Sequence, residues 1–598
     1  MAARQTIEPR PSIEAVGLAA TLVCAKAIAL AGHAWPRSPW TPFALFWQDA
    51  FVALIWAVVE TTAPPIVLVR SLYVAVVAYI AINVPVTRVL GSPMTRTMWR
   101  AAGGAMSDSV RHELTLANVS AVGAVIAVAV LVPRWTSRRR WRPGWRTLAA
   151  ASLFVAIGVP ASRRVDTGGR DRNAIGALFP TPAVAAVAPL DGDLRRSLSG
   201  PPPAEDLTAL RGAGRGLNVV MVVLESTAAR YLRLYGAADD PTPHLTALGQ
   251  TGVVFENAYA VYPESIRELL AWLCARDPAY AATAAEDAAM PCASIADQVK
   301  AAGYRTALFH SGRFDYLDMR ALVEGRGFDT LEDAAAIGGR VHSSFGVAEQ
   351  ATVERLLAWV DAERAGQPLQ PCQPFFVAYL PIAGHHPYAT EGPGPFDGRT
   401  AAGQYLNALH EGDAALGTLI AGLRTRGLDE QTMFIVFGDH GEAFGQHDGN
   451  SGHSLFIYDE NVRVPLIVRI PHGRPTRVWR PVSVVDIGPT ILDLVGVKPA
   501  PDLDGVSMLD RAARLAFFFT DYSRPWVGLR DGCWKYLLDI DAGRSRLFDV
   551  CADPDEVTDR SAEPAPDERA YRQRAMQWLT HTQSVFTRSA PRTSGPSR

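Results

Sequence analysis

The N-terminal quarter of the chain carries five long apolar runs separated by short polar loops. A membrane-spanning helix needs about 20 predominantly apolar residues. The pattern therefore predicts five transmembrane helices within residues 1–164, the last of them short. A water-soluble helical domain is the less favoured alternative, because runs of this length rarely recur in soluble chains. The runs cover residues 16–35, 43–59, 66–84, 116–132 and 148–160.

Arginine placement sets the expected orientation of these helices. The loop between the fourth and fifth runs is rich in arginine, so the positive-inside rule makes it cytoplasmic. Counting runs then places the N-terminus inside and everything after residue 160 outside. The loop at residues 88–114 also carries arginines although this assignment puts it outside. The arginines of the inner loop are Arg134, Arg138, Arg139, Arg140, Arg142 and Arg146.

After the apolar runs the pattern changes twice. Residues 165–215 are rich in Gly, Pro and Arg and are expected to form a linker. From residue 216 to 580, short apolar segments alternate with helical ones, which predicts an α/β domain with a parallel sheet covered by helices on both faces. Residues 581–598 are expected to be a disordered tail. The expected strands are 219–224, 305–309, 375–380, 432–437 and 464–470, and the expected helices are 295–302, 347–362 and 405–425.

Polar side chains with catalytic chemistry follow directly after two of these strands. Glu225 follows the apolar run 219–224, and Asp439 and His440 follow the run 433–437. The carboxyl ends of strands in an open α/β sheet are where ligands bind. A simpler interpretation of Glu225 is a helix start capped by Ser226 or Thr227.

Two further segments add candidates. Ser265 and Glu268 have the spacing of a capping box ahead of an apolar helix, and by itself this pair indicates a cap. A serine at a helix N-terminus also lies beside free amide donors, where an anionic group is favoured. His385 and His386 follow the strand 375–380, and a surface turn led by Pro387 is the simpler interpretation of that pair.

Taken together, these segments predict a single metal site with Glu225, Ser265, Asp439 and His440 as ligands. Mixed oxygen and nitrogen ligands suit zinc or manganese. His385 and His453 are expected to surround a tetrahedral anion, and Ser265 is expected to be a nucleophile activated by the cation. His447 lies in the same glycine-rich loop as His453. His310 and Arg320 are weaker candidates for the pocket lining.

The amino-acid composition gives information on the net charge of the chain and on the redox compartment of its cysteines. The net charge of −2 favours neither nucleic acid nor an acidic tail, and almost all basic residues are Arg, as in GC-rich bacterial genomes. Outside the membrane, Cys274 and Cys292 could form one disulfide and Cys533 and Cys551 another, leaving Cys372 free. Asp49, in the second apolar run, would be a buried carboxylate with a function or a residue at the membrane interface.

Several segments in order resemble the sulfatase domain of the alkaline phosphatase superfamily. They are NVVMVVLEST, the segment around YPESIRELL, FGDHGEAFG with GHSLFIYDENVRVPLIV, VSVVDIGPTILDLVG and WKYLLD. With the preceding membrane runs, the chain is most similar to the lipoteichoic acid synthase and lipid A phosphoethanolamine transferase branch. By motif position, this resemblance implies Glu225, Ser265, Asp439 and His440 as metal ligands and His385 and His453 as phosphate-handling residues.

The resemblance implies an enzyme of the bacterial inner membrane with its catalytic domain on the periplasmic or extracellular side. It would move phosphoethanolamine or phosphoglycerol from a phospholipid to a cell-envelope glycan or lipid through a phosphoserine at Ser265. Alternatives are a hydrolase on the same site, either a phosphodiesterase or a sulfatase, and a catalytically silent membrane protein that binds lipid or glycan.

Three departures from the family pattern bear on this choice. The branch usually has threonine where this chain has Ser265. Sulfatases that convert this residue to formylglycine have Pro or Ala two residues on and Arg four residues on, where this chain has Arg267 and Leu269. Glu264 adds a negative charge beside the expected nucleophile.

Overall fold

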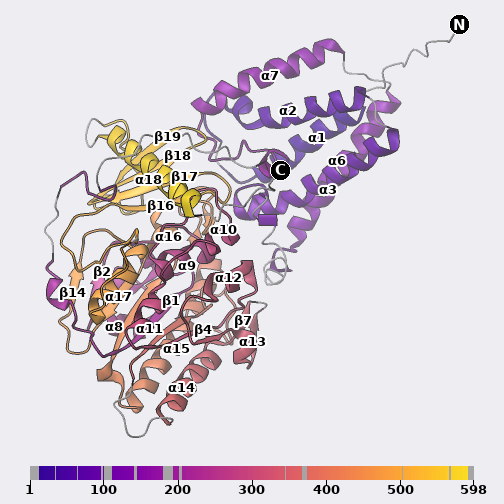
Figure 1. Cartoon of the computed structure of the whole chain (residues 1–598). Coiled ribbons are helices and arrows are strands. Elements are labelled where there is room, and N and C mark those ends of the chain that lie inside the picture. The colour runs from indigo at the N-terminus through magenta and orange to yellow at the C-terminus, as the bar shows by residue number, and fades with distance from the viewer. Residues whose placement is uncertain are drawn as a thin grey trace, which may run out of the picture.

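A computed structural model describes residues 13–33, 35–62, 65–95, 98–99, 111–139, 144–179, 193–200, 205–343, 345–365, 373–501, 503–563 and 567–589. The chain forms a bundle of long apolar helices and an α/β domain that contacts one end of the bundle (Figure 1).

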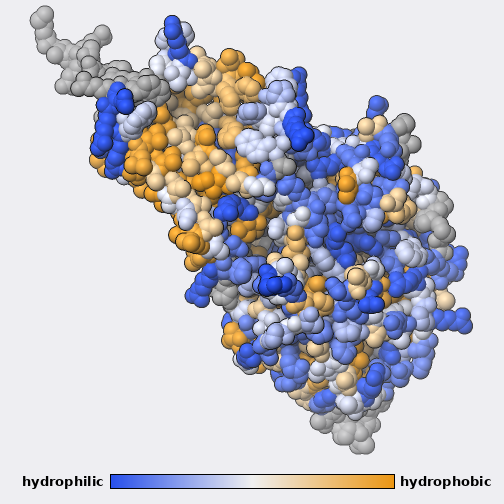
Figure 2. Space-filling view, turned by 180° about the vertical axis from the view of Figure 1, so that it is seen from behind, coloured by the Kyte–Doolittle hydropathy of each residue, from blue (hydrophilic) through white to orange (hydrophobic). Residues whose placement is uncertain are grey.

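Each of the five apolar runs forms a helix of the bundle. Four of the described helices are long and apolar enough to cross a membrane. The described part of α1 has 17 residues, fewer than the others. Many apolar side chains of the bundle are exposed, and they gather on its outer face in Figure 2. An exposed apolar surface of this extent is typical of a region that contacts a membrane or another protein. The helices are α1 (Ile13–Ala29), α2 (Thr41–Thr61), α3 (Ile66–Leu90), α6 (Leu116–Arg138) and α7 (Trp145–Arg164).

An eight-stranded sheet forms the centre of the α/β domain. Its central strand β1 (Asn218–Leu224) runs parallel to β8 (Phe375–Leu380) on one side and β9 (Thr432–Gly438) on the other. The α/β fold is therefore as the sequence predicts, with the carboxyl ends of β1 and β9 side by side. The strand order is β14 (Thr476–Val478), β2 (Val253–Phe255), β13 (Leu466–Arg469), β9, β1, β8, β4 (Arg305–His310) and β5 (Thr330–Glu332).

One strand departs from the expected parallel sheet. β13, which covers most of the expected strand at 464–470, pairs antiparallel with β9. A parallel return needs a crossover, usually through a helix. The helix in the intervening residues 439–465, α16 (Asp459–Val462), has four residues and is too short for such a crossover. The chain therefore turns back antiparallel.

Helices cover both faces of this sheet, and β1 shows why its sequence is apolar throughout. Val219, Met221 and Val223 pack into a cluster with α9 (Ser265–Cys274), α11 (Ile295–Ala301) and α17 (Ile487–Val495). Val220 and Val222 pack on the opposite face, against α14 (Glu349–Ala365) and α15 (Ala401–Thr425). A strand buried on both faces has no polar alternation.

The C-terminal part adds an antiparallel four-stranded sheet and a helix. Disulfides join Cys274 to Cys292 and Cys533 to Cys551, which confirms both suggested pairs, whereas Cys372 lies outside the described residues. Helix α18 (Glu568–Ser589) extends through residues 581–589, so this part of the expected tail is helical, and its Phe586 packs against the core. The strands are β16 (Ala516–Thr520), β17 (Trp526–Asp531), β18 (Trp534–Asp539) and β19 (Arg544–Asp549).

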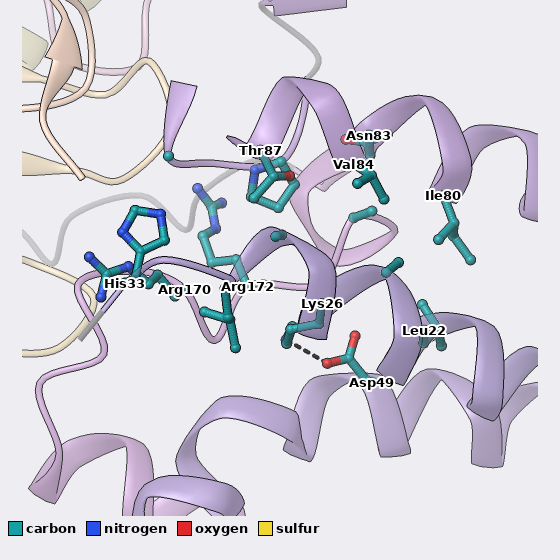
Figure 3. A pocket seen from close by; sticks show the side chains of 16 residues that line it. Leu22, Lys26, His33, Asp49, Ile80, Asn83, Val84, Thr87, Arg170 and Arg172 are labelled. Carbon is teal, nitrogen blue, oxygen red and sulfur yellow. Dashed lines mark ion pairs between the residues drawn. The ribbon is translucent and has the colours of Figure 1, made fainter. Parts of the chain in front are cut away.

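The first part of the expected linker is folded against the helix bundle. Asp49 of α2 pairs with Lys26 of α1 at 2.5 Å (Figure 3). Its other oxygen accepts a hydrogen bond from Asn173 at 2.5 Å. Lys26 also donates to the backbone oxygen of Asp171 at 2.9 Å. The carboxylate that the sequence marks as unusual therefore anchors the segment that leaves the last membrane helix.

Candidate active site

Glu225 lies where β1 ends and the backbone turns sharply. Ser226 adopts a left-handed conformation with φ 51°, which costs free energy for a residue with a side chain. This turn directs the Ser226 amide to Asp439 Oδ1 at 2.9 Å, and the Ser226 hydroxyl donates to Glu225 at 2.8 Å. Ser226 is therefore not a helix cap, and its strained conformation links the ends of β1 and β9.

Ser265 is the first residue of α9, but it does not cap the helix. The cap is Glu264, whose carboxylate accepts from the amides of Ile266 at 3.2 Å and Arg267 at 3.4 Å. Glu268, the other half of the expected capping box, accepts instead from the amides of Val261 and Tyr262. The capping-box interpretation is wrong because Glu264 occupies the amides that Ser265 would have used.

The Ser265 hydroxyl is therefore free to face the ends of β1 and β9. Its Oγ lies 3.0 Å from Glu225 Oε2 and 3.1 Å from His440 Nε2. The carboxylate of Glu264, which the sequence places beside the expected nucleophile, is directed at the amides of α9, where the helix dipole favours a carboxylate.

Asp439 and His440 complete the cluster. Asp439 Oδ1 accepts from the amides of Ser226 and His440, and its Oδ2 lies 3.5 Å from His440 Nε2. His440 is fully buried, and its Nδ1 donates to the Gly441 carbonyl at 2.9 Å. This hydrogen bond leaves the lone pair of Nε2 directed at the cluster, as a metal-binding histidine requires.

The donor atoms of Glu225, Asp439 and His440 lie within 4.8 Å of one another, and all three residues are buried. In the part of the chain that the structure describes, neither carboxylate forms an ion pair with an arginine or lysine. Burial raises the pKa of Asp439 to about 6 and, with repulsion from Asp439, raises the pKa of Glu225 well above its ordinary value. Two buried carboxylates and an imidazole nitrogen fit a divalent cation, which would supply the missing positive charge.

His453 lies on the other side of His440, with ring centroids 4.3 Å apart. Its Nδ1 donates to the buried carboxylate of Glu442 at 2.8 Å. Burial opposes protonation, but Glu442, together with Glu225 and Asp439, raises the pKa of His453 to about 9. His453 is therefore a cation at neutral pH, poised to donate from Nε2.

His385 lies near His453, with ring centroids 6.5 Å apart, and is in the opposite charge state. Its Nδ1 donates to the His386 carbonyl at 2.6 Å, and burial lowers its pKa to about 3. It is therefore neutral, with Nε2 available as an acceptor. Environments that separate the pKa values of two histidines in this way provide an acid and a base at one site.

A cavity of about 50 Å³ opens beside these groups. Glu225, Ser265, Asp439 and His385 line it, together with His310 and Arg313. His310 therefore lies where the sequence suggests. Arg320 does not line the cavity, because it is exposed and pairs with Asp315 and Glu324. His447 is also outside the site, bonded to Glu460 at 2.6 Å and stacked on Tyr458.

Sequence reasoning missed two residues of the site. Glu442 holds His453 and also accepts a hydrogen bond from Tyr388 at 2.9 Å. Its position in the DHGE segment, three residues after Asp439, was the available signal. Arg313 supplies a cation to the cavity lining, and nothing in its sequence context marks it.

The hairpin of β10 (Ala443–Phe444) and β11 (Ser451–Gly452) joins this site to the helix bundle. Its tip residue Asp448 pairs with Arg170 at 2.5 Å and with His33 at 3.0 Å. His453 directly follows β11. The active-site hairpin is therefore braced on residues that follow α1 and α7.

Sequence comparisons relate the α/β domain to a known family. The sulfatase family model matches residues 217–497. Mouse arylsulfatase K is 33% identical over 179 residues, which cover 27% of this chain and 32% of that protein. Choline-sulfatase of Rhizobium meliloti is 33% identical over 164 residues, covering 25% of this chain and 31% of that protein. The matched part thus spans about a third of the length of these curated relatives.

Solved structures show the same fold. Lipoteichoic acid synthase LtaP from Listeria monocytogenes superposes with a TM-score of 0.54 at 17% identity, covering 65% of this chain and 97% of that one. A protein of the alkaline phosphatase superfamily from Vibrio parahaemolyticus superposes with a TM-score of 0.52 at 20% identity, covering 63% of this chain and 89% of that one.

Proposed function

We propose that this protein is a metal-dependent headgroup transferase of the membrane, because the sulfatase family model matches residues 217–497, the part of the chain that contains Ser265. It moves a phosphorus-containing headgroup, phosphoethanolamine or phosphoglycerol, from a phospholipid to a glycan or lipid of the bacterial cell envelope. The observation that carries the proposal is the Ser265 hydroxyl, 3.1 Å from His440 Nε2 and 3.0 Å from Glu225.

The residues present can hold the cation and perform the transfer. Glu225, Asp439, His440 and Ser265 would hold it, and a cation there would lower the pKa of the serine hydroxyl. Ser265 gives its proton to Glu225 along their hydrogen bond while Oγ bonds to phosphorus. The bond from phosphorus to the diacylglycerol oxygen breaks, and His453 protonates that oxygen. Neutral His453 then takes the proton of the acceptor hydroxyl, whose oxygen displaces Ser265 from phosphorus, and Glu225 returns its proton to the departing Ser265 oxygen.

The helix bundle supports a lipid donor. Residues next to the ends of α1 and α7 contact the hairpin that precedes His453. A substrate whose acyl chains remain in a bilayer can therefore present its headgroup to this side of the catalytic domain. On this proposal the arginine-rich end of α6 lies on the cytoplasmic side and the catalytic domain on the periplasmic or extracellular side.

Sulfate-ester hydrolysis is the second candidate, and the names of the relatives favour it. The surroundings of Ser265 count against it. Arg267 replaces the Pro or Ala of the formylglycine pattern, and it is buried between Asp287 at 3.0 Å and Asp521 at 2.8 Å. A phosphodiesterase would use the same unmodified serine with water as acceptor.

Mass spectrometry of the Ser265 peptide separates these candidates. After incubation with phospholipid and no acceptor, transfer predicts a phosphoethanolamine or phosphoglycerol adduct on Ser265. Oxidation of Ser265 to an aldehyde would identify a sulfatase. An adduct that decays equally fast with and without a labelled glycan acceptor would identify a phosphodiesterase. An unmodified serine, together with no metal and no cleavage of a nitrophenyl phosphodiester, would indicate a protein that only binds lipid or glycan.

A further inference from the structure

Three metal-binding side chains meet between the helix bundle and the catalytic domain, outside the site described above. His112 and Glu113 lie just ahead of α6, and His386 lies in the loop after β8. Their donor atoms lie within 4.8 Å of one another. These residues are about 270 positions apart in the chain, so only the docking of the two domains brings them together.

We propose that His112, Glu113 and His386 bind a second divalent cation, which fastens the helix bundle to the loop carrying His385. Two imidazoles and one carboxylate are a donor set of zinc, with a water molecule completing the tetrahedron. Bonds of about 2.1 Å allow ligand atoms at most ~4.2 Å apart. Small side-chain rotations therefore suffice to close the site on an ion.

The site is accessible from solvent. His112 is exposed, while Glu113 and His386 are half-buried. An ion can reach it without opening either domain, and the exposed side leaves room for the water ligand. Burial of the other two residues limits the motion of their side chains.

A hydrogen-bonded chain on the membrane side positions Glu113. Asn118, which is buried at the start of α6, donates to the Glu113 backbone oxygen at 2.9 Å and to its Oε2 at 3.4 Å. Arg88 donates to Asn118 Oδ1 at 3.0 Å, which fixes the orientation of the amide. Groups that orient a metal ligand in this way affect metal affinity about 10–100-fold.

On the catalytic side, His386 is connected to the active site. Its carbonyl accepts the hydrogen bond that holds His385, and its ring packs edge-on against Tyr388. Tyr388 in turn donates to Glu442, the partner of His453. An ion on His386 would therefore hold the loop that orients both histidines of the active site.

Metal stoichiometry of the full chain in detergent tests the proposal. The protein is stripped with chelator, dialysed against zinc and analysed by inductively coupled plasma mass spectrometry. Wild type is expected to retain two equivalents, and His112→Ala or Glu113→Gln one. Asn118→Ala should weaken the second equivalent about 10–100-fold. His33→Ala, which alters another histidine between bundle and catalytic domain, is the matched control and should retain both.

Failure of this site and failure of the catalytic site give different results. Asp439→Asn should lose one equivalent and keep the other, and combining it with His112→Ala should lose both. The proposal of a second site would be overturned if the wild type retained one equivalent of metal that His112→Ala kept and Asp439→Asn lost. The catalytic site would stand in that case. The proposal would also be overturned if wild type, His112→Ala and Glu113→Gln all retained two equivalents of metal. Visible absorption of the cobalt-substituted Asp439→Asn protein, lost on adding His112→Ala, would identify the nitrogen ligand directly.

Discussion

Asp448 and Arg170 form an ion pair 2.5 Å long between the tip of the active-site hairpin and the segment that leaves the last membrane helix. His33, which follows α1, contacts the same carboxylate at 3.0 Å. The hairpin leads directly to His453, so this contact fixes one side of the active site relative to the helix bundle.

Asp448→Asn should therefore impair reaction with lipid more than reaction with a soluble substrate. Asp448 is half exposed, and exposed pairs contribute about 1 kcal/mol or less. We expect at most a roughly tenfold loss of kcat/KM on phospholipid vesicles and little change on a nitrophenyl phosphodiester. The control is Asp361→Asn on α14, which removes an ion pair between Asp361 and Arg426. Equal losses on both substrates would contradict a role in presenting lipid.

Removal of the nucleophile or of the cation should abolish activity by different routes. Ser265→Ala should lower kcat by roughly 10⁴-fold or more, while Glu225, Asp439 and His440 still retain most of the cation. Asp439→Asn should lower both kcat and the metal content. Chelation of the wild-type protein should be reversed by zinc or manganese, whichever the site takes, and the same treatment should not rescue Ser265→Ala. Residual turnover of Ser265→Ala near that of wild type would rule out the serine as nucleophile.

The pH dependence of substrate binding should report the state of His453. Its pKa is raised to about 9, so the imidazolium is present below that pH and is lost as pH rises through it. KM for an anionic phosphodiester is expected to rise on the alkaline side. A bound cation moves the whole profile towards acid, so the comparison with a variant is the decisive measurement.

Glu442→Gln provides that comparison. Removal of its carboxylate takes away the main influence that raises the pKa of His453, while burial still lowers it. The inflection should therefore move to lower pH by more than about one unit. Each unit corresponds to about 1.4 kcal/mol of interaction that favours the protonated imidazole over the neutral one. Identical profiles in wild type and Glu442→Gln would show that another group titrates.

The cap of α9 should couple stability to catalysis. Glu264→Ala should cost about 1 kcal/mol of the free energy of unfolding. Because Ser265 is the next residue, fraying of the first turn should also lower kcat by up to about 100-fold. Thr400 caps α15, and its hydroxyl accepts a hydrogen bond from the Gly403 amide at 3.0 Å. Thr400→Ala removes this cap. It should show a similar stability loss with kcat unchanged. Thermal unfolding and kcat measured together separate the two effects.

The sequence was sufficient to place Glu225, Asp439 and His440, because apolar runs mark buried strands and parallel strands end at one edge. The cap of α9 was not predictable, since Ser265 is a preferred N-cap residue type and Glu264 is not, and only the surrounding fold makes Glu264 the cap. The direction of β13 depends on how the chain returns after β9, which periodicity does not reveal. Contacts between distant segments, such as Glu442 with His453 and Asp448 with Arg170, follow from hairpin geometry and domain docking.

The Lys26–Asp49 pair has a consequence for how the chain enters its membrane. Each charge alone would oppose partition of its helix into hydrocarbon by a few kcal/mol, whereas the pair, 2.5 Å apart, is neutral as a unit. The first two spans are therefore expected to leave the translocon together as a helical hairpin. Replacing only Lys26 or only Asp49 by an apolar residue should leave an unmatched charge and slow biogenesis, and replacing both should restore it.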